Sequence, residues 1–284
     1  MEIGIFEQTF ERPTLEARLD AVRAHGMAHV QFNFASAGVP SMPDQIPPEL
    51  VTKVRQAMEA RQITIAAVSG TFNIIHPDQQ TRRIGMQRLL VLASVCRDLG
   101  SSIITLSTGT RDAEDMWRHH PDNATPSAWR ETVRAMGEIS AIGETFNVTM
   151  AFEPEVSNVV DSAQQARRLL DELRSPYIKV VIDGANLFHT GELPHMARIL
   201  DEAFDLLGDD IVLAHAKDLS HDGEAGHEPA GHGLLDYDHY LRLLQRSGYN
   251  GPLILHGLDE SQVDGCVAFL REKLAAIGPG DRSQ

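Results

Sequence analysis

Three short apolar runs of the sequence each end in a side chain that can bind a metal ion. These side chains are Glu153, Asp183 and His215, which stand 30 and 32 residues apart along the chain. A parallel β-strand with its returning helix needs about that length. We therefore expect the three side chains to project from the same end of three neighbouring parallel strands, where a barrel builds a catalytic metal site.

The elements that would position these residues recur along the whole chain. Apolar residues at spacings of three and four, as at Leu50, Val54 and Met58, indicate amphipathic helices between strand-like runs. Eight strand–helix units predict an α/β fold, a single (β/α)8 TIM barrel with its active site at the C-terminal ends of the strands. An open doubly wound sheet is the alternative, but the glycine-rich phosphate turn typical of it is absent from the sequence. The strand-like runs are 3–10, 29–34, 63–70, 102–107, 148–155, 178–183, 211–217 and 252–257.

The domain organisation follows from the same pattern. We expect one barrel domain over residues 1–277 and a flexible, polar C-terminal tail over 278–284. The stretches after the second, fourth and seventh strands are long, namely 35–48, 108–126 and 219–236. Long loops in compact domains are usually functional, which again points to the carboxyl ends of the strands.

The composition argues against several classes of partner. A net charge of −15 argues against nucleic acid, and no apolar run approaches the roughly 18 residues that span a membrane. The first residues lack the basic region and cleavage site of a secretory signal. The two cysteines, Cys96 and Cys266, have no metal-binding spacing and are interpreted as reduced core thiols. We therefore expect a cytoplasmic protein that binds neither nucleic acid nor membrane.

Each of the three ligand candidates also has an ordinary interpretation. Glu153 could be a solvent-facing strand end, Asp183 a helix cap, and His215 a core histidine. Their equivalent positions in consecutive units favour the metal site. His256 ends the last strand in the same way and either completes a Glu/Asp/His/His site or hydrogen-bonds to a ligand. Such a set suits one divalent ion, with Mn²⁺ placed before Co²⁺ or Zn²⁺ and all three before Mg²⁺.

These residues resemble the xylose isomerase-like TIM-barrel superfamily, in which sugar and sugar-phosphate isomerases and epimerases dominate. The resemblance covers essentially the whole chain and lies in the order of the three ligands, in His-Ala-Lys-Asp at 215–218, and in Gly-His-Gly-Leu-Leu-Asp-Tyr at 231–237. It implies a divalent metal at the carboxyl end of the barrel that holds vicinal oxygens of a ketose or hydroxy-ketone. Barrels of this kind often dimerise through loops on the catalytic face, so a homo-oligomer is expected.

The chain departs from the ketose epimerases of that group in two places. They usually end the last strand with a second glutamate that ligates the metal and serves as the opposing acid or base, where this chain has His256. They often carry another glutamate after the ligand of the fifth strand, where Asn158 stands here, with Glu155 nearer. We interpret Glu153 as the catalytic base, His256 as the opposing acid or base, and Asn158 as a substrate contact.

Five further side chains are predicted to contact substrate. His76 and His189 follow the third and sixth strands, although His189 stands farther from Asp183 than the corresponding histidine of the family, and both have an exposed loop position as the alternative. Arg111 could fork onto substrate oxygens or pair with a loop carboxylate, and Trp117 could wall the pocket. Lys217 should share the strand face of His215, with an ion pair as its alternative.

Four functions are compatible with the sequence. The first is a metal-dependent isomerase or epimerase of a small ketose or polyol-derived ketone, acting by proton abstraction through a metal-stabilised enediolate. The second is a metal-dependent dehydratase of inosose-like ketones, with His256 as the general acid. An apurinic-site endonuclease would need a multi-zinc cluster of His76, His189, His215 and His232, and is opposed by the acidic charge. The fourth is a non-catalytic sugar-binding barrel.

Overall fold

The strands of the computed structural model, which describes residues 1–278, form a closed barrel. Each strand of the ring pairs in parallel with its neighbour, and the last closes the ring between the seventh and the first. The predicted (β/α)8 barrel is therefore confirmed. Its strands are β1 (Ile3–Phe6), β2 (His29–Phe32), β3 (Thr64–Ser69), β4 (Ile103–Ser107), β5 (Thr149–Glu153), β6 (Ile178–Asp183), β7 (Ile211–Asp218) and β9 (Leu253–Leu255).

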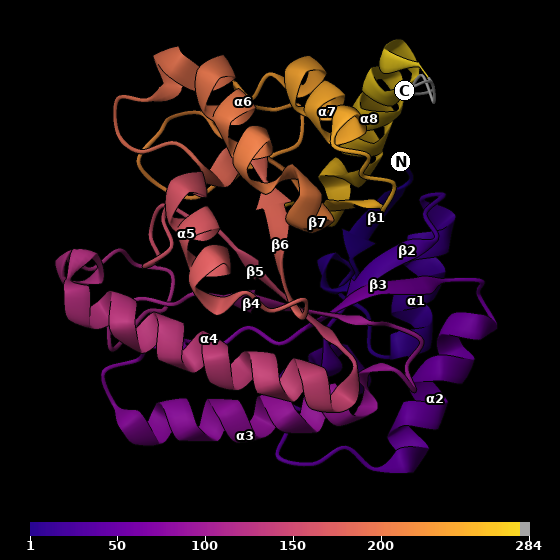
Figure 1. Ribbon diagram of the computed structural model, residues 1–284. Coiled ribbons are helices and arrows are strands. Elements are labelled where there is room, and N and C mark those ends of the chain that lie inside the picture. Colours follow the sequence, from indigo (N-terminus) through magenta and orange to yellow (C-terminus); the bar gives the residue numbers. More distant parts are fainter. Residues whose placement is uncertain (279–284) are drawn as a thin grey trace.

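The α-helices surround this ring (Figure 1), with α3 and α4 side by side along one flank and α6, α7 and α8 along another. Their buried apolar residues recur at helical spacing, as the sequence pattern predicts. Among residues 1–278 no helix combines the length and apolarity needed to cross a bilayer. The helices are α1 (Leu15–Ala24), α2 (Pro48–Glu59), α3 (Gln79–Cys96), α4 (Pro126–Phe146), α5 (Ala163–Leu173), α6 (Met196–Leu207), α7 (Tyr237–Arg246) and α8 (Val263–Ile277).

The eight expected strand runs coincide with the eight strands of the ring, and the differences lie at their ends. The first run was expected to reach residue 10, but β1 ends at Phe6 and the chain turns into a short 3₁₀ helix at Glu7–Thr9. A two-residue strand that the pattern does not predict, β8 (Glu228–Pro229), pairs antiparallel with the end of β7. The tail expected at 278–284 lies, beyond Gly278, outside the described residues.

The interior of the barrel holds a small apolar layer that supports the site. Side chains of a strand alternate between faces, so the residue two positions further along points the same way. Four residues of this layer are therefore followed, two positions later, by Glu153, Asp183, His215 and His256. The apolar layer comprises Ala67, Ala151, Val181, Leu213 and Ile254, all buried.

Glu7 is a fully buried carboxyl group just beyond β1. Its Oε1 accepts a hydrogen bond from the backbone N–H of Asn33, at 3.0 Å, which ties the end of β1 to the segment after β2. Burial outweighs this hydrogen bond and raises the pKa of Glu7 to about 7. Below about pH 7 the folded protein therefore favours the protonated form of Glu7.

We predict that the free energy of unfolding falls between pH 4.5, the ordinary pKa of Glu7, and its folded pKa of about 7. In this window the unfolded chain releases the proton that the folded protein retains, a difference of ~3 kcal/mol for one group. The variant Glu7→Gln should lose this component of the decline in urea titrations across pH, whereas Glu11→Gln, at an exposed position, should retain it. If the unsubstituted protein, Glu7→Gln and Glu11→Gln showed the same pH dependence of the free energy of unfolding, the raised pKa assigned to Glu7 would be contradicted.

Candidate active site

A cavity of about 800 Å³ opens at the carboxyl ends of the strands. Its wall combines polar side chains of the barrel interior with residues of the loops that follow the strands. A concave site with a few convergent polar groups at this end of a barrel is the usual position of an active site. The wall includes Phe6, Gln31, Ser69, Thr105, Trp117, Glu153, Glu155, Asn186, His215, Lys217, Glu224, His227 and His256.

The structure brings Glu153, Asp183 and His215 together. One donor atom from each lies within 4.8 Å of the others, although the residues come from three different strands. Asp183 and His215 are direct partners in the β6–β7 register, and Glu153 ends the adjacent strand β5. The arrangement follows from the strand spacing, because equivalent positions of neighbouring parallel strands share one edge of the barrel.

His215 is oriented by a hydrogen-bond network inside the barrel. Its Nε2–H donates to Oε1 of Gln31 at 2.9 Å. The Gln31 amide nitrogen donates in turn to the hydroxyls of Ser69 and Thr105, at 3.1 and 3.0 Å. Because Nε2 is committed to Gln31, Nδ1 is the ring atom available to a cation. This Nδ1 is buried, has no hydrogen-bond partner among residues 1–278, and lies 3.4 Å from Oε1 of Glu153.

Glu153 is held from the short 3₁₀ helix Gly184–Asn186, which follows the neighbouring strand. Its Oε1 accepts a hydrogen bond from the side-chain amide of Asn186 at 2.6 Å. Burial opposes ionisation, but the contacts with His215 and the charge of Lys217 lower the pKa of Glu153 to about 2. Asn186 also accepts a hydrogen bond from the backbone N–H of Gly226 at 2.8 Å, which joins the carboxylate to the loop after β7.

Asp183 and Lys217 form a buried ion pair. Nζ of Lys217 lies 3.3 Å from Oδ2 of Asp183, and Oδ1 accepts from the backbone N–H of Ala185 at 3.0 Å. Burial raises the pKa of Asp183 against the charge of Lys217. Burial lowers the pKa of Lys217, but Asp183, Glu153 and Glu155 together raise it above its ordinary value. Oδ2 of Asp183 is otherwise without a hydrogen-bond partner among the described residues.

These observations fit a divalent cation. Two buried donors without a hydrogen-bond partner among residues 1–278, Oδ2 of Asp183 and Nδ1 of His215, face a centre that a carboxylate of Glu153 also reaches. Three buried or half-buried carboxyl groups, Glu153, Asp183 and Glu155, surround the single ammonium group of Lys217. A mixed set of carboxylates and imidazole suits transition-metal ions of intermediate softness.

His256 lies beside these three donors. Its ring stacks on Phe6, with the ring centroids 4.2 Å apart, and lies 5.6 Å from the ring of His215. Burial, assisted by the nearby charge of Lys217, holds the pKa of His256 well below its usual value. Nδ1 of this imidazole is buried and has no partner in the described part of the chain. Its role as fourth ligand or as acid and base stays a prediction.

Glu155 is a site residue that the sequence analysis did not propose. It lines the cavity two positions beyond Glu153, and its buried Oε1 has no hydrogen-bond partner within residues 1–278. Burial and the charge of Glu153 raise the pKa of Glu155 to about 7. The alternation of side chains along a strand could have indicated Glu155, because it lies two positions beyond Glu153. In the same way, the polar residue Gln31 inside an apolar strand could have indicated the hydrogen bond that orients His215.

Two of the predicted substrate contacts, Lys217 and Trp117, line the cavity. Lys217 shares the inward face of β7 with His215, as expected. Trp117 comes from the loop after β4 and is 57% exposed. Its indole therefore stands at the rim, where it can cover a bound molecule. Contact with substrate remains a prediction for both.

Two others, His76 and Arg111, have partners elsewhere. The guanidinium of Arg111 forms an ion pair with Glu131 of α4 at 2.9 Å, instead of with the loop carboxylates expected as its alternative, and does not line the cavity. Its contact with substrate stays a prediction. A ring nitrogen of His76 lies 3.0 Å from the carbonyl oxygen of Ala113, and His76 lines a neighbouring hollow. The contact between His76 and Ala113 joins the loop after β3 to the loop after β4.

Asn158 and His189 also differ in position from the expectation. Oδ1 of Asn158 accepts hydrogen bonds from the hydroxyl of Ser107, at 2.6 Å, and from the backbone of Gly109, at 2.7 Å. Its buried amide thus joins two loops. His189 is partly exposed, and its ring lies 3.8 Å from the carboxylate of Asp161, on the wall of a separate hollow. His189 therefore does not line the cavity at the barrel mouth, and its contact with substrate stays a prediction.

Comparison with known proteins agrees with this fold. Residues 19–273 match the family model described as xylose isomerase-like TIM barrel. The chain belongs to this family, as its motifs led us to expect.

Two curated relatives are sugar epimerases by name. The L-ribulose-5-phosphate 3-epimerase UlaE of Shigella flexneri serotype 5b (strain 8401) is 24% identical over 68% of this chain and 63% of its own length. The ketose 3-epimerase of Arthrobacter globiformis is 23% identical over 51% of this chain and 47% of its own length. The chain thus spans less than two thirds of the length of these two relatives.

Solved structures share the fold at low sequence identity. A D-tagatose 3-epimerase-like protein has a TM-score of 0.77 at 12% identity, covering 98% of both chains. The IOLI protein, solved with a zinc atom, has a TM-score of 0.72 at 15% identity over the whole of both chains. The probable 3-DHS dehydratase AsbF of Bacillus anthracis has a TM-score of 0.73 at 14% identity, covering 95% of this chain and 99% of its own.

We predict that Gln31→Leu weakens Mn²⁺ binding by about 10–100-fold, because the acceptor that orients His215 is removed. The buried Nε2–H would also lose its partner, lowering the free energy of unfolding by ~1–3 kcal/mol. Calorimetric titration of the stripped protein with Mn²⁺ measures the affinity. Ser69→Ala is the matched control, since Gln31 retains Thr105 and His215. Equal affinity in the unsubstituted protein and Gln31→Leu would contradict the role of Gln31.

Proposed function

We propose that this protein is a divalent-metal-dependent isomerase or epimerase of a small ketose or related hydroxy-ketone. The observation that carries the proposal is the convergence of Glu153, Asp183 and His215, of which Glu153 and His215 line the cavity at the barrel mouth. Two curated relatives named as sugar epimerases support the same class of substrate. The acidic net charge of −15 accords with a neutral small molecule better than with a polyanion.

The three donors would hold one divalent ion. We propose Mn²⁺, with Co²⁺ and Zn²⁺ as alternatives, because two carboxylates and an imidazole form a set of mixed hardness. A bound cation of this kind supplies Lewis acidity, which polarises a substrate carbonyl and acidifies the adjacent C–H. His256 is not among the donors that lie within 4.8 Å of one another, so it would add a fourth ligand only after a shift of its ring.

The first proton transfer is assigned to Glu153. Its Oε1 is held by the amide of Asn186, which leaves Oε2 free to accept a proton from the carbon next to the carbonyl. The ammonium group of Lys217, on the same strand face as His215, is positioned to bind a substrate oxygen and to stabilise negative charge there. Phe6 and Trp117 contribute apolar surface that limits the access of water to the sugar.

The second proton transfer needs a group on the other side of the substrate. His256 is the candidate from the sequence, and its Nδ1 is free of hydrogen bonds within the described chain. Glu155 is the candidate from the structure, since an unpartnered oxygen of its carboxyl group lies at the cavity wall. An epimerase that inverts a carbon centre requires both a base and an opposing acid, and either residue would serve.

A dehydratase of inosose-like ketones is the second candidate function. The observation in its favour is His256, which stands where ketose epimerases of the family usually have a glutamate. The same proton abstraction by Glu153 would then be followed by departure of a β-hydroxyl group, protonated by the opposing residue. The two reactions differ in product mass, because only the dehydratase releases water.

The apurinic-site endonuclease is less favoured by the geometry. Its multi-zinc cluster would need His76, His189, His215 and His232 close together. Within residues 1–278, His76 and His189 lie on separate hollows and His232 is exposed. A non-catalytic sugar-binding barrel would retain metal and bind ketoses without turnover, which the following experiment distinguishes.

We predict that a panel of ketoses and inososes, incubated in D₂O with Mn²⁺-loaded protein, contains a substrate that gains deuterium and an epimeric product. Removal of metal by EDTA should abolish this exchange, and Mn²⁺ should restore it. Nuclear magnetic resonance and mass spectrometry measure the products. Loss of water would favour the dehydratase, binding without exchange would favour the binding barrel, and full activity after EDTA would contradict metal dependence.

We predict that Glu153→Gln lowers turnover by about 10²–10⁴-fold on the substrate so identified, because the amide cannot accept the proton. Glu272→Gln makes the same chemical change at an exposed position on α8 and should retain full turnover. Steady-state kinetics and a melting curve for each variant separate loss of chemistry from loss of fold. Near-normal turnover of a folded Glu153→Gln protein would remove this residue from the mechanism.

A further inference from the structure

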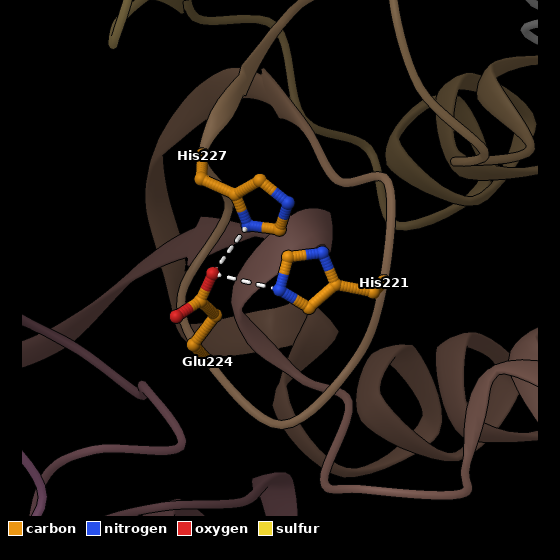
Figure 2. A group of neighbouring side chains, drawn as sticks. All are labelled: His221, Glu224 and His227. Carbon is orange, nitrogen blue, oxygen red and sulfur yellow. Dashed lines mark ion pairs between the residues drawn. The ribbon is translucent and has the colours of Figure 1, made fainter.

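A second group of metal-competent side chains lies in the loop between β7 and α7. Figure 2 shows His221, Glu224 and His227, hereafter the loop triad, with both imidazole rings turned toward one carboxylate. The three residues stand at intervals of three along the chain. None of them was singled out as a ligand by the strand pattern, because they belong to a loop without regular periodicity.

The geometry of the loop triad centres on a single oxygen. Nε2 of His221 lies 2.9 Å from Oε1 of Glu224, and Nδ1 of His227 lies 3.3 Å from the same atom. The two rings are close, with centroids 4.2 Å apart and an angle of 39° between their planes. One donor atom from each residue lies within 4.8 Å of the other two. A small outward shift of each side chain would admit a cation among the three.

The donor set indicates which cation would bind. Two imidazoles and one carboxylate form the set that proteins use for Zn²⁺ with an open coordination position. The side chains of His221 and Glu224 are 61% and 56% exposed, which leaves room for a water ligand. Nε2 of His227 accepts a hydrogen bond from the backbone N–H of Ser220 at 3.2 Å, and Nδ1–H faces the carbonyl oxygen of Ala225 at 3.1 Å. A cation at Nδ1 would displace this proton, and the ring would then take the tautomer whose Nε2–H donates to the hydroxyl of Ser220, 2.9 Å away.

The loop that carries these donors is fixed to the barrel. Asp218, at the end of β7, accepts backbone hydrogen bonds from Leu219 and Leu235 at its Oδ1 and from Gly231 at its Oδ2. Asp222, inside the triad segment, accepts from the backbone N–H of Leu193 at 2.9 Å. The ligands are therefore presented by a pinned loop, which lowers the entropic cost of ordering them around an ion.

The loop triad also adjoins the candidate active site. Glu224 and His227 line its cavity, and Gly226 between them donates to Asn186, which in turn donates to Glu153. An ion bound to the triad would fix this part of the cavity wall. The connection is a continuous series of hydrogen bonds from the loop to a predicted ligand of the barrel-mouth site.

We propose that the loop triad is a second divalent-cation site, selective for Zn²⁺, that orders residues 221–227 at the edge of the cavity. Its ion is separate from the one assigned to Glu153, Asp183 and His215. The loop triad would bind Zn²⁺ whether or not the barrel is an epimerase, because its ligands are not the residues assigned to catalysis.

The test is the number of Zn²⁺ ions bound per full-length chain. The protein is stripped with EDTA, dialysed against buffered Zn²⁺ and analysed for metal by mass spectrometry. The double variant His221→Ala/His227→Ala should bind one ion fewer than the unsubstituted protein. The control His232→Ala removes an exposed histidine from the same loop and should bind the full number. The double variant Asp183→Asn/His215→Ala should keep the triad ion.

Hydrogen exchange gives a second readout that does not depend on activity. Zn²⁺ should slow exchange of the backbone amides of residues 221–227 several-fold in the unsubstituted protein and leave it unchanged in His221→Ala/His227→Ala. An equal number of bound ions in these two proteins would overturn the proposal. Failure of the barrel-mouth site would instead appear as an unchanged ion count in Asp183→Asn/His215→Ala.

Discussion

The electrostatic cost of placing several carboxyl groups together in a barrel interior is the constraint on which the site depends. Glu153 and Glu155 line one cavity, and Asp183 is buried beside Glu153. Burial raises the pKa of Asp183 and Glu155 and opposes ionisation of Glu153. Buried charges persist only when they are paired, hydrogen-bonded or bound to metal. Lys217 supplies one positive charge. A divalent cation bound by Glu153, Asp183 and His215 would supply the rest.

The surrounding hydrogen bonds show how the fold maintains this arrangement. Gln31 fixes the orientation of His215 from across the barrel, and Asn186 fixes Glu153 from the 3₁₀ helix after β6. Each of these amides also bonds to a third element, the hydroxyls of β3 and β4 for Gln31 and the loop after β7 for Asn186. The ligand geometry is therefore set by several strands at once, which is the condition for a preorganised site.

Much of this could be predicted from the sequence, because strands impose a strict period. Equivalent positions 30 and 32 residues apart predicted that Glu153, Asp183 and His215 would meet, and the structure brings them together. The period does not extend into loops. Arg111 and His76 bind neighbouring loop and helix atoms instead of lining the cavity, since their directions depend on tertiary contacts that no local pattern encodes. The pattern likewise gave no indication of the loop triad.

The most direct test of the account is a crystal structure of the protein grown with Mn²⁺, with anomalous scattering used to locate the ion. The account predicts one strong peak at the barrel mouth, within coordination distance of Oδ2 of Asp183, Nδ1 of His215 and a carboxylate oxygen of Glu153. A barrel mouth without such a peak at saturating Mn²⁺, or a peak that contacts none of these three residues, would contradict the account.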